Sequence, residues 1–171
     1  MFLGVWKTNS FIMKILDCTL RDGGYYTNWD FDDALVTTYI NAMNQLPIDY
    51  IELGYRNVSS NGYTGKFGYS PVSILKHIRN NSKKKLAIML NEKSTRPDDL
   101  STLLIPIIGL VDMIRIAVDP INFERAVILA KEIKQFGFEV GFNTMYMSKW
   151  KEYEGFLDKL EKINGKIGRA H

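Results

Sequence analysis

The stretch LDCTLRDGG, at residues 16–24, joins a short apolar segment to a compact group of charged residues and glycines. Residues 14–19 include a short apolar run, so we expect a strand that ends among the charges. Arg21 and Asp22 follow at once, and Gly23 and Gly24 would allow a tight turn with room for a ligand. Charged residues at the carboxyl end of a parallel strand face the edge where α/β proteins bind ligands.

The neighbouring Arg21 and Asp22 side chains suit two roles. The Asp22 carboxylate is a hard oxygen ligand for Mg²⁺ or Mn²⁺. The Arg21 guanidinium is permanently charged and can donate hydrogen bonds to a developing enolate oxygen. The same pair could instead be structural and cap the first turn. Residue chemistry alone leaves both interpretations open.

Outward from this stretch, short strand patterns alternate with longer helical ones. We expect strands at 14–19, 50–54, 85–90, 113–118 and 139–143, and helices at 31–46, 70–80, about 97–108, 122–136 and 149–163. Such alternation is typical of parallel βαβ units and indicates an α/β fold. Five units form either an open doubly wound sheet or part of a closed barrel, which typically needs ~250 residues.

The composition is that of an ordinary globular protein with one domain: 171 residues, 46% hydrophobic, 24% charged and a net charge of +3. The only dense basic run, at 83–85, lacks interleaved aromatic residues, so we expect no nucleic-acid partner. No apolar run approaches the ~18 residues that span a bilayer, so we expect no membrane partner. The single cysteine fits a reducing cytoplasm.

The ends differ from the centre. Residues 1–12 resemble neither a signal peptide nor a strand, and we expect an N-terminal extension, with Met13 as a possible true start. Residues 13–164 hold the repeated units, and residues 165–171 are expected to form a C-terminal tail. Within the repeats, the glycine and aromatic residues of 56–69 could contact substrate or form a plain surface loop.

The string DCTLRDGG, at residues 17–24, resembles the D-x-T-L-R-D-G signature of the DRE-TIM metallolyase superfamily. These barrel enzymes include 4-hydroxy-2-oxovalerate aldolase, 3-hydroxy-3-methylglutaryl-CoA lyase and the isopropylmalate and homocitrate synthases. Further residues are similar in order and location to the superfamily pattern: Glu52, Gly54, Arg115, Asn143 and Met145. The resemblance implies an incomplete TIM barrel, with about five of eight units present, rather than an open sheet.

The resemblance also implies roles for single residues. Asp22 would be the carboxylate ligand of Mg²⁺ or Mn²⁺, and Arg21 would stabilise a pyruvate enolate formed by cleavage of a C–C bond beside a 2-oxo acid. Asp17 would be an inward carboxylate that orients this corner. Substrate-binding roles are expected for three residues on later strands: Glu52, Arg115 and Asn143. Glu52 could equally pair with Arg115 across the barrel interior.

The sequence departs from the superfamily pattern in two respects. It has only two histidines, His77 and His171, and neither belongs to the His-x-His metal-binding pair of the superfamily. Aldolases of this type place a catalytic histidine close behind the D-G, where this chain has Tyr25, so Tyr25 is the candidate acid or base. The Claisen synthases have D-G-E-Q, and Gly24 does not match that glutamate. The sequence therefore resembles the cleaving lyases more than the Claisen synthases.

Several functions remain open. The chain could be part of an aldolase that is inactive alone and binds metal weakly. It could instead be a split or self-associating barrel half that needs a partner chain, a non-catalytic binding protein, or a Claisen-type acyl transferase. The expected small-molecule substrate is accordingly a 2-oxo acid or an acyl-CoA.

Overall fold

The computed structural model describes residues 13–57 and 62–164. The expected extension at 1–12 and the expected tail at 165–171 lie outside the described residues. Four residues of the glycine and aromatic stretch, 58–61, lie outside them as well.

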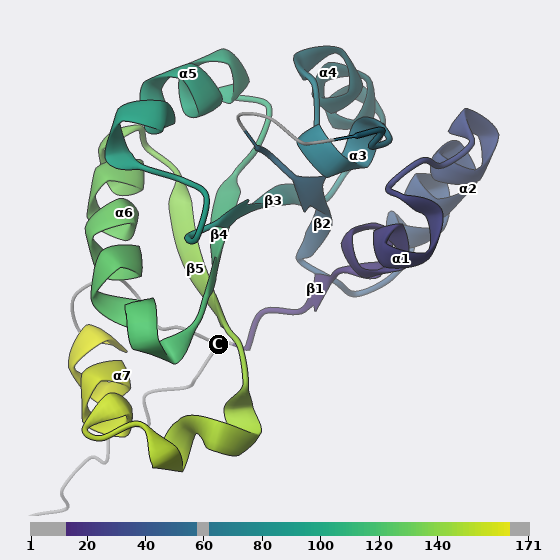
Figure 1. Ribbon diagram of the computed structural model, residues 1–171. Helices are drawn as coiled ribbons and strands as arrows, with labels where there is room; N and C mark the ends of the chain where they lie inside the picture. Colours follow the sequence, from purple (N-terminus) through teal and green to yellow (C-terminus); the bar gives the residue numbers. More distant parts are fainter. Residues whose placement is uncertain (1–12, 58–61, 165–171) are drawn as a thin grey trace, which may run out of the picture.

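The described strands form one parallel sheet of five. In chain order they are β1 (Leu16–Asp17), β2 (Tyr50–Tyr55), β3 (Lys85–Asn91), β4 (Met113–Val118) and β5 (Glu139–Thr144). Their order in the sheet is the same, β1-β2-β3-β4-β5. A doubly wound sheet would reverse its order at a switch point, whereas successive neighbours that all advance in one direction build a barrel. The sheet is curled, so the chain forms an incomplete α/β barrel (Figure 1).

Helices lie around the outside of the curled sheet (Figure 1). They are α1 (Thr19–Thr27), α2 (Asp33–Met43), α3 (Lys66–Tyr69), α4 (Val72–Asn81), α5 (Leu100–Leu104), α6 (Phe123–Gln135) and α7 (Phe156–Asn164). Short 3₁₀ turns occur at η1 (Pro97–Asp99), η2 (Ile105–Ile107), η3 (Pro120–Asn122) and η4 (Met147–Glu152). Among the described residues, no helix has both the length and the apolar character that crossing a bilayer requires.

The two faces of the sheet carry different side chains because neighbours along a strand point to opposite sides. The outward face packs against the helices and provides much of the core: Ile51, Leu53, Leu86, Ile88, Leu90, Ile114, Ile116 and Val118. The inward positions of the same strands include Tyr50, Glu52, Met113 and Arg115. Polar side chains are therefore concentrated on the concave side.

The stretch at 16–24 differs from its expected form. We predicted a strand over 14–19 followed by a glycine turn, but β1 has only two residues and α1 begins at Thr19. Gly23 and Gly24 both lie inside α1. A Cβ atom at Gly24 would lie 2.0 Å from the indole of Trp29, so this glycine makes room for a ring rather than for a turn.

Other helix boundaries also differ. The helix expected from residue 31 begins at Asp33, because the Asp32 side chain caps α2 by accepting hydrogen bonds from the backbone N–H groups of Ala34 and Leu35. Ser70 does not start α4; it ends α3 with a left-handed backbone, φ 43°. The helix expected at 97–108 is divided into η1, α5 and η2, and the last helix begins at Phe156 rather than near 149.

Candidate functional site

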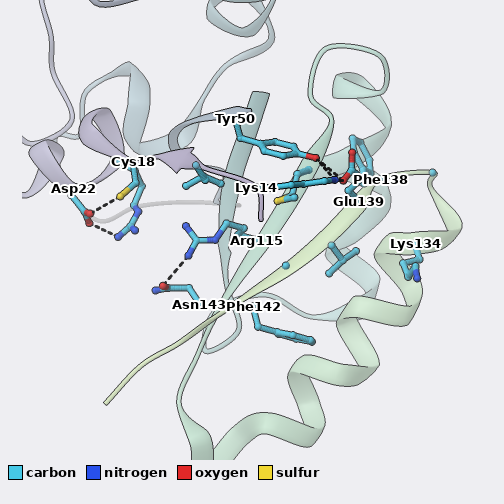
Figure 2. A pocket seen from close by; sticks show the side chains of 16 residues that line it. Lys14, Cys18, Asp22, Tyr50, Arg115, Lys134, Phe138, Glu139, Phe142 and Asn143 are labelled. Carbon is cyan, nitrogen blue, oxygen red and sulfur yellow. Dashed lines mark hydrogen bonds and ion pairs between the residues drawn. The ribbon is translucent and has the colours of Figure 1, made fainter. Parts of the chain in front are cut away.

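A hollow of about 910 Å³ occupies the concave side of the sheet. Figure 2 shows Cys18 and Asp22 at one side of it, Arg115 and Asn143 near its centre, and the Lys14, Tyr50 and Glu139 group farther along. Asn143 and Asp22 lie towards the carboxyl ends of the strands, where α/β barrels carry their active sites. Contacts join five of the seven predicted site residues at this hollow: Arg21, Asp22, Glu52, Arg115 and Asn143.

Arg21 is the centre of this group. Arg21 is only 8% exposed to solvent, although its guanidinium carries a permanent charge. Nε donates to Oε2 of Glu52 over 2.9 Å, and Nη1 forms an ion pair with Oδ1 of Asp22. Burial opposes the charge, but the Glu52 and Asp22 carboxylates outweigh burial and raise the pKa of Arg21 above its usual value.

Glu52 joins Arg21 to Arg115. Its side chain is fully buried, and Oε2 also accepts a 2.8 Å hydrogen bond from Nη1 of Arg115. Nη2 of Arg115 donates to Oδ1 of Asn143 over 3.0 Å. The other Glu52 oxygen, Oε1, has no hydrogen-bond partner among the described residues. The contact between Glu52 and Arg115 was one of the two alternatives for Glu52, and the structure shows it.

Gly141 explains how Arg115 reaches across the sheet. Arg115 pairs with Gly141 in the register of β4 and β5. A Cβ atom at position 141 would lie 3.2 Å from Cγ of Arg115. The missing side chain therefore lets the Arg115 stem lie over β5, with its guanidinium between Glu52 and Asn143.

Asp22 is the predicted metal ligand, and its side chain is 53% exposed at the edge of the hollow. Oδ1 pairs with Arg21, and Oδ2 accepts a 3.1 Å hydrogen bond from the thiol of Cys18. Burial and this contact with Asp22 raise the pKa of the Cys18 thiol to about 11. The thiol therefore remains protonated near neutral pH.

These residues suit a metal only in part. One accessible carboxylate is an appropriate ligand for Mg²⁺ or Mn²⁺. Within residues 13–57 and 62–164, however, no three His, Cys, Asp or Glu side chains lie close enough together to hold an ion. The described residues offer one ligand and do not form a complete metal site.

Asp17 lies on the other face of the sheet, which corrects the expectation that it points inward. It pairs in register with Ile51, whose side chain belongs to the outer core. Its carboxylate accepts hydrogen bonds from the hydroxyl of Tyr39 on α2 and from the backbone N–H and hydroxyl of Thr19. Asp17 thus fixes the start of α1 against α2 and does not line the hollow.

Tyr25, the predicted acid or base, lies one helical turn after Arg21 on α1. Its hydroxyl lies 2.8 Å from the hydroxyl of Tyr55, the last residue of β2. Trp29 contacts both rings edge-on, with centroid distances of 4.8 Å to Tyr25 and 5.6 Å to Tyr55. The indole N–H donates to the carbonyl of Arg21 over 2.9 Å, so one ring supports both the tyrosine pair and the arginine.

Farther along the hollow, Glu139 forms a second charged cluster. It pairs with Lys14 at 3.1 Å and Lys85 at 2.5 Å, and it accepts a 2.7 Å hydrogen bond from the hydroxyl of Tyr50. Burial works to raise the pKa of the Glu139 carboxyl, but the hydrogen bonds from Lys85, Tyr50 and Lys14 outweigh it and lower the pKa to about 2. Because Lys14 precedes β1 and Glu139 begins β5, this contact joins the two edges of the curled sheet.

The glycine and aromatic stretch has a structural role in its described part. The N–H of Gly65 donates to the carbonyl of Asn28 over 2.7 Å, and the N–H of Phe67 donates to that of Trp29 over 3.2 Å. A Cβ atom at Gly65 would lie 2.3 Å from the backbone of Asp30. This stretch therefore packs against the segment that follows α1, and none of its described residues lines the hollow.

Comparison with known proteins gives a partial identification. No protein family model matches the chain, and no curated protein matches it. The chain is similar to a solved structure described as "the N-terminal domain of a putative aldolase from Bacteroides vulgatus", with 70% sequence identity and a TM-score of 0.87. The similarity covers 91% of this chain and 52% of that one, so the chain spans about half the length of its solved relative.

A more distant structure supports the fold alone. Phospho-2-dehydro-3-deoxyheptonate aldolase from Thermotoga maritima is 15% identical, with a TM-score of 0.53 over 98% of this chain and 43% of that one. Both matches are to structures described as aldolases. The chain therefore has an aldolase-type barrel fold, of which the described residues form five strands.

Proposed function

We propose that this chain is the N-terminal part of a divalent-metal-dependent lyase that cleaves a C–C bond beside a 2-oxo acid through a pyruvate enolate. The reaction would resemble that of 4-hydroxy-2-oxovalerate aldolase in the DRE-TIM metallolyase superfamily. One observation carries the proposal: a nearly buried arginine, Arg21, lines the hollow beside the carboxylate of Asp22.

Arg21 suits an enolate because its position is already fixed. Glu52 and Asp22 hold the guanidinium, and a buried donor needs little rearrangement when negative charge develops nearby. A guanidinium has five N–H groups, more than the contacts with Glu52 and Asp22 use. The N–H groups that these two contacts leave unused can therefore donate to a ligand oxygen in the hollow.

Arg115 and Asn143 suit the substrate carboxylate. Both line the hollow, and their 3.0 Å hydrogen bond keeps the Arg115 guanidinium directed along the carboxyl ends of β4 and β5. A planar guanidinium matches a carboxylate with two parallel hydrogen bonds. We assign Arg115 and Asn143 to substrate binding and Glu52 to positioning both arginines.

A metal ion is part of the proposal. Asp22 would provide one ligand to Mg²⁺ or Mn²⁺, and the remaining ligands would come from outside the described residues. When bound, the ion would polarise the 2-oxo group as a Lewis acid.

The remaining barrel half is the proposed partner. β1 and β5 are the edges of the five-stranded sheet, and unpaired strand edges bind further strands readily. The solved relative extends well beyond the similar region, which leaves length for further units. A cytoplasmic location, suggested by the single cysteine, belongs to the same proposal.

The test is pyruvate release from 4-hydroxy-2-oxovalerate by the full-length protein in the presence of Mn²⁺. We expect Asp22→Asn to abolish turnover, and Arg21→Lys to lower it by about 10²-fold, because lysine cannot reproduce the planar guanidinium contacts. Lys66→Arg, on the exposed surface of α3, is the control and should retain activity. Full turnover in Asp22→Asn would end the proposal.

A further inference from the structure

Tyr55 reaches the concave side of the sheet through an irregularity in β2. In the register of β2 with β3, Glu52 pairs with Ala87 and Tyr55 pairs with Met89. Three steps along β2 therefore correspond to two steps along β3. One extra residue in β2 therefore reverses the alternation, as a β-bulge does. Without it Tyr55 would face the helices; with it Tyr55 faces the same side as Glu52.

The bulge brings Tyr55 to Arg21 and Tyr25. The Tyr55 and Tyr25 hydroxyls lie 2.8 Å apart, and Arg21 is close enough to interact with the Tyr55 hydroxyl. Tyr25, 62% exposed, is the outer member of the pair, and Tyr55 is the inner one. Trp29 holds both rings by edge contacts.

The surroundings of Tyr55 keep the proton on its hydroxyl, where it can be donated in a hydrogen bond. Burial raises the pKa of Tyr55 above its usual value, the hydrogen bond with Tyr25 raises it further, and Arg21 opposes these effects less strongly. The Tyr55 phenol therefore stays protonated near pH 7. Of the two O–H hydrogens of Tyr25 and Tyr55, one forms the contact between the rings, and the other remains available to a ligand oxygen.

We propose that Tyr25 and Tyr55 form one proton-donating unit that hydrogen-bonds the carbonyl oxygen of the aldehyde partner, beside the enolate held by Arg21. Tyr55 is thereby a further catalytic residue. This inference rests on the proposed lyase function and deepens it, because it assigns a donor for the second half of the substrate.

The proton balance follows in the condensation direction. The enolate carbon attacks the aldehyde carbon, a C–C bond forms, and the C=O electron pair moves to oxygen. That oxygen takes the proton of one tyrosine hydroxyl, and solvent returns a proton to the phenolate. The proton that the pyruvate methyl group loses to solvent balances the proton that solvent returns.

The test separates enolate formation from aldehyde chemistry in the full-length protein. Enolate formation is followed as exchange of the pyruvate methyl hydrogens for deuterium in D₂O, by NMR with Mn²⁺ present. Condensation of pyruvate with acetaldehyde is measured in parallel. The variants are Tyr55→Phe, Tyr25→Phe and the double variant, with Tyr26→Phe as the matched control, because Tyr26 is the next residue on α1 and is 94% exposed.

We expect each single variant to lower condensation by about 10²-fold, the usual contribution of a positioned acid, and to leave exchange near the wild-type rate. The double variant should be little worse than either single one, because the two hydroxyls act together. Tyr26→Phe should match the wild type in both reactions.

Wild-type condensation by Tyr55→Phe would overturn the inference, and so would an equal loss of exchange and condensation. If the wild-type protein exchanged no hydrogen at all, the proposed lyase function itself would fail, and this inference with it. If the variants kept both normal exchange and normal condensation, the role of the tyrosine pair would be rejected, but the proposed lyase function would stand.

Discussion

The Nε atom of Arg21 lies 2.9 Å from Oε2 of Glu52, although 31 positions separate the two residues in the chain. The contact joins α1 to β2 and places a cation against a carboxylate that solvent does not reach. The Arg115 guanidinium uses the same oxygen. One buried carboxylate thus positions two cations of the candidate site.

Replacement of Glu52 should therefore destabilise the fold. In Glu52→Gln, Arg21 and Arg115 lose their shared buried charge partner, and breaking a buried ion pair typically costs about 3–5 kcal/mol. The free energy of unfolding from urea titration measures this loss. Glu124→Gln is the control, because the Glu124 side chain is 80% exposed and pairs with Lys159 on the surface. Equal stability of Glu52→Gln and the wild type would contradict the contact.

Acid should weaken the cluster around Glu139. Its pKa is about 2 in the folded protein and near 4.5 in the unfolded chain, so the unfolded chain binds the proton more readily. The stabilisation is complete above pH 4.5 and is lost as the pH falls towards 2. Because the side chain is 36% exposed, solvent screening reduces this stabilisation, and we expect about 1–2 kcal/mol.

Urea titrations of the wild type and Glu139→Gln between pH 7 and pH 2 measure this dependence. The difference in unfolding free energy between the two proteins should shrink as the pH falls through this window. Glu154→Gln, with an exposed side chain, should run parallel to the wild type. A constant difference between the wild type and Glu139→Gln would count against the lowered pKa.

Two adjacent glycines of α1 should respond differently to alanine. A Cβ atom at Gly24 would lie 2.0 Å from Trp29, whereas at Gly23 the nearest atom would be 3.7 Å away. Gly24→Ala should cost about 1–3 kcal/mol through overpacking and should shift Trp29 away from Tyr25. Gly23→Ala should be neutral or stabilising by up to about 1 kcal/mol, because alanine favours a helix. Thermal unfolding and tryptophan fluorescence distinguish the two, and similar melting temperatures would reject the Trp29 packing.

Metal binding should depend on the completed barrel. Asp22 is a single carboxylate ligand, and the described residues gather no three suitable side chains. Mn²⁺ titration, followed by electron paramagnetic resonance, should show weak binding to residues 1–171 and tight binding to the full-length protein. Equally tight binding by both would mean that this chain holds a complete site.

The sequence predicted the architecture more completely than the site. The regular alternation of strands and helices gave the α/β class, and the resemblance at 17–24 favoured a barrel, which the strand order confirms. Arg21, Asp22, Glu52, Arg115 and Asn143 were all named from the sequence, and contacts join them. The contacts among Glu52, Arg115 and Asn143 follow from their shared inward face of the sheet, whereas Arg21 and Asp22 reach that face from α1.

The remaining site residues depended on local irregularities. Asp17 was expected to point inward, but it pairs in register with Ile51 and its carboxylate accepts a hydrogen bond from Tyr39 on the outer face. Tyr55 could not be predicted by alternation, because the extra residue in β2 reverses its direction. Trp29 contacts Tyr25 and Tyr55 from a left-handed backbone conformation, φ 55°. This conformation is rare for a tryptophan, so the sequence does not predict it.

The central claim is that Arg21 and Asp22 support a pyruvate enolate, and hydrogen exchange tests it most directly. The full-length protein is incubated with pyruvate in D₂O, with Mn²⁺ or with EDTA, and loss of the methyl proton signal is followed by NMR. We predict Mn²⁺-dependent exchange in the wild type that is abolished in Asp22→Asn and strongly reduced in Arg21→Lys. Exchange that persists unchanged in both variants, or no exchange in the wild type with Mn²⁺, would contradict the account.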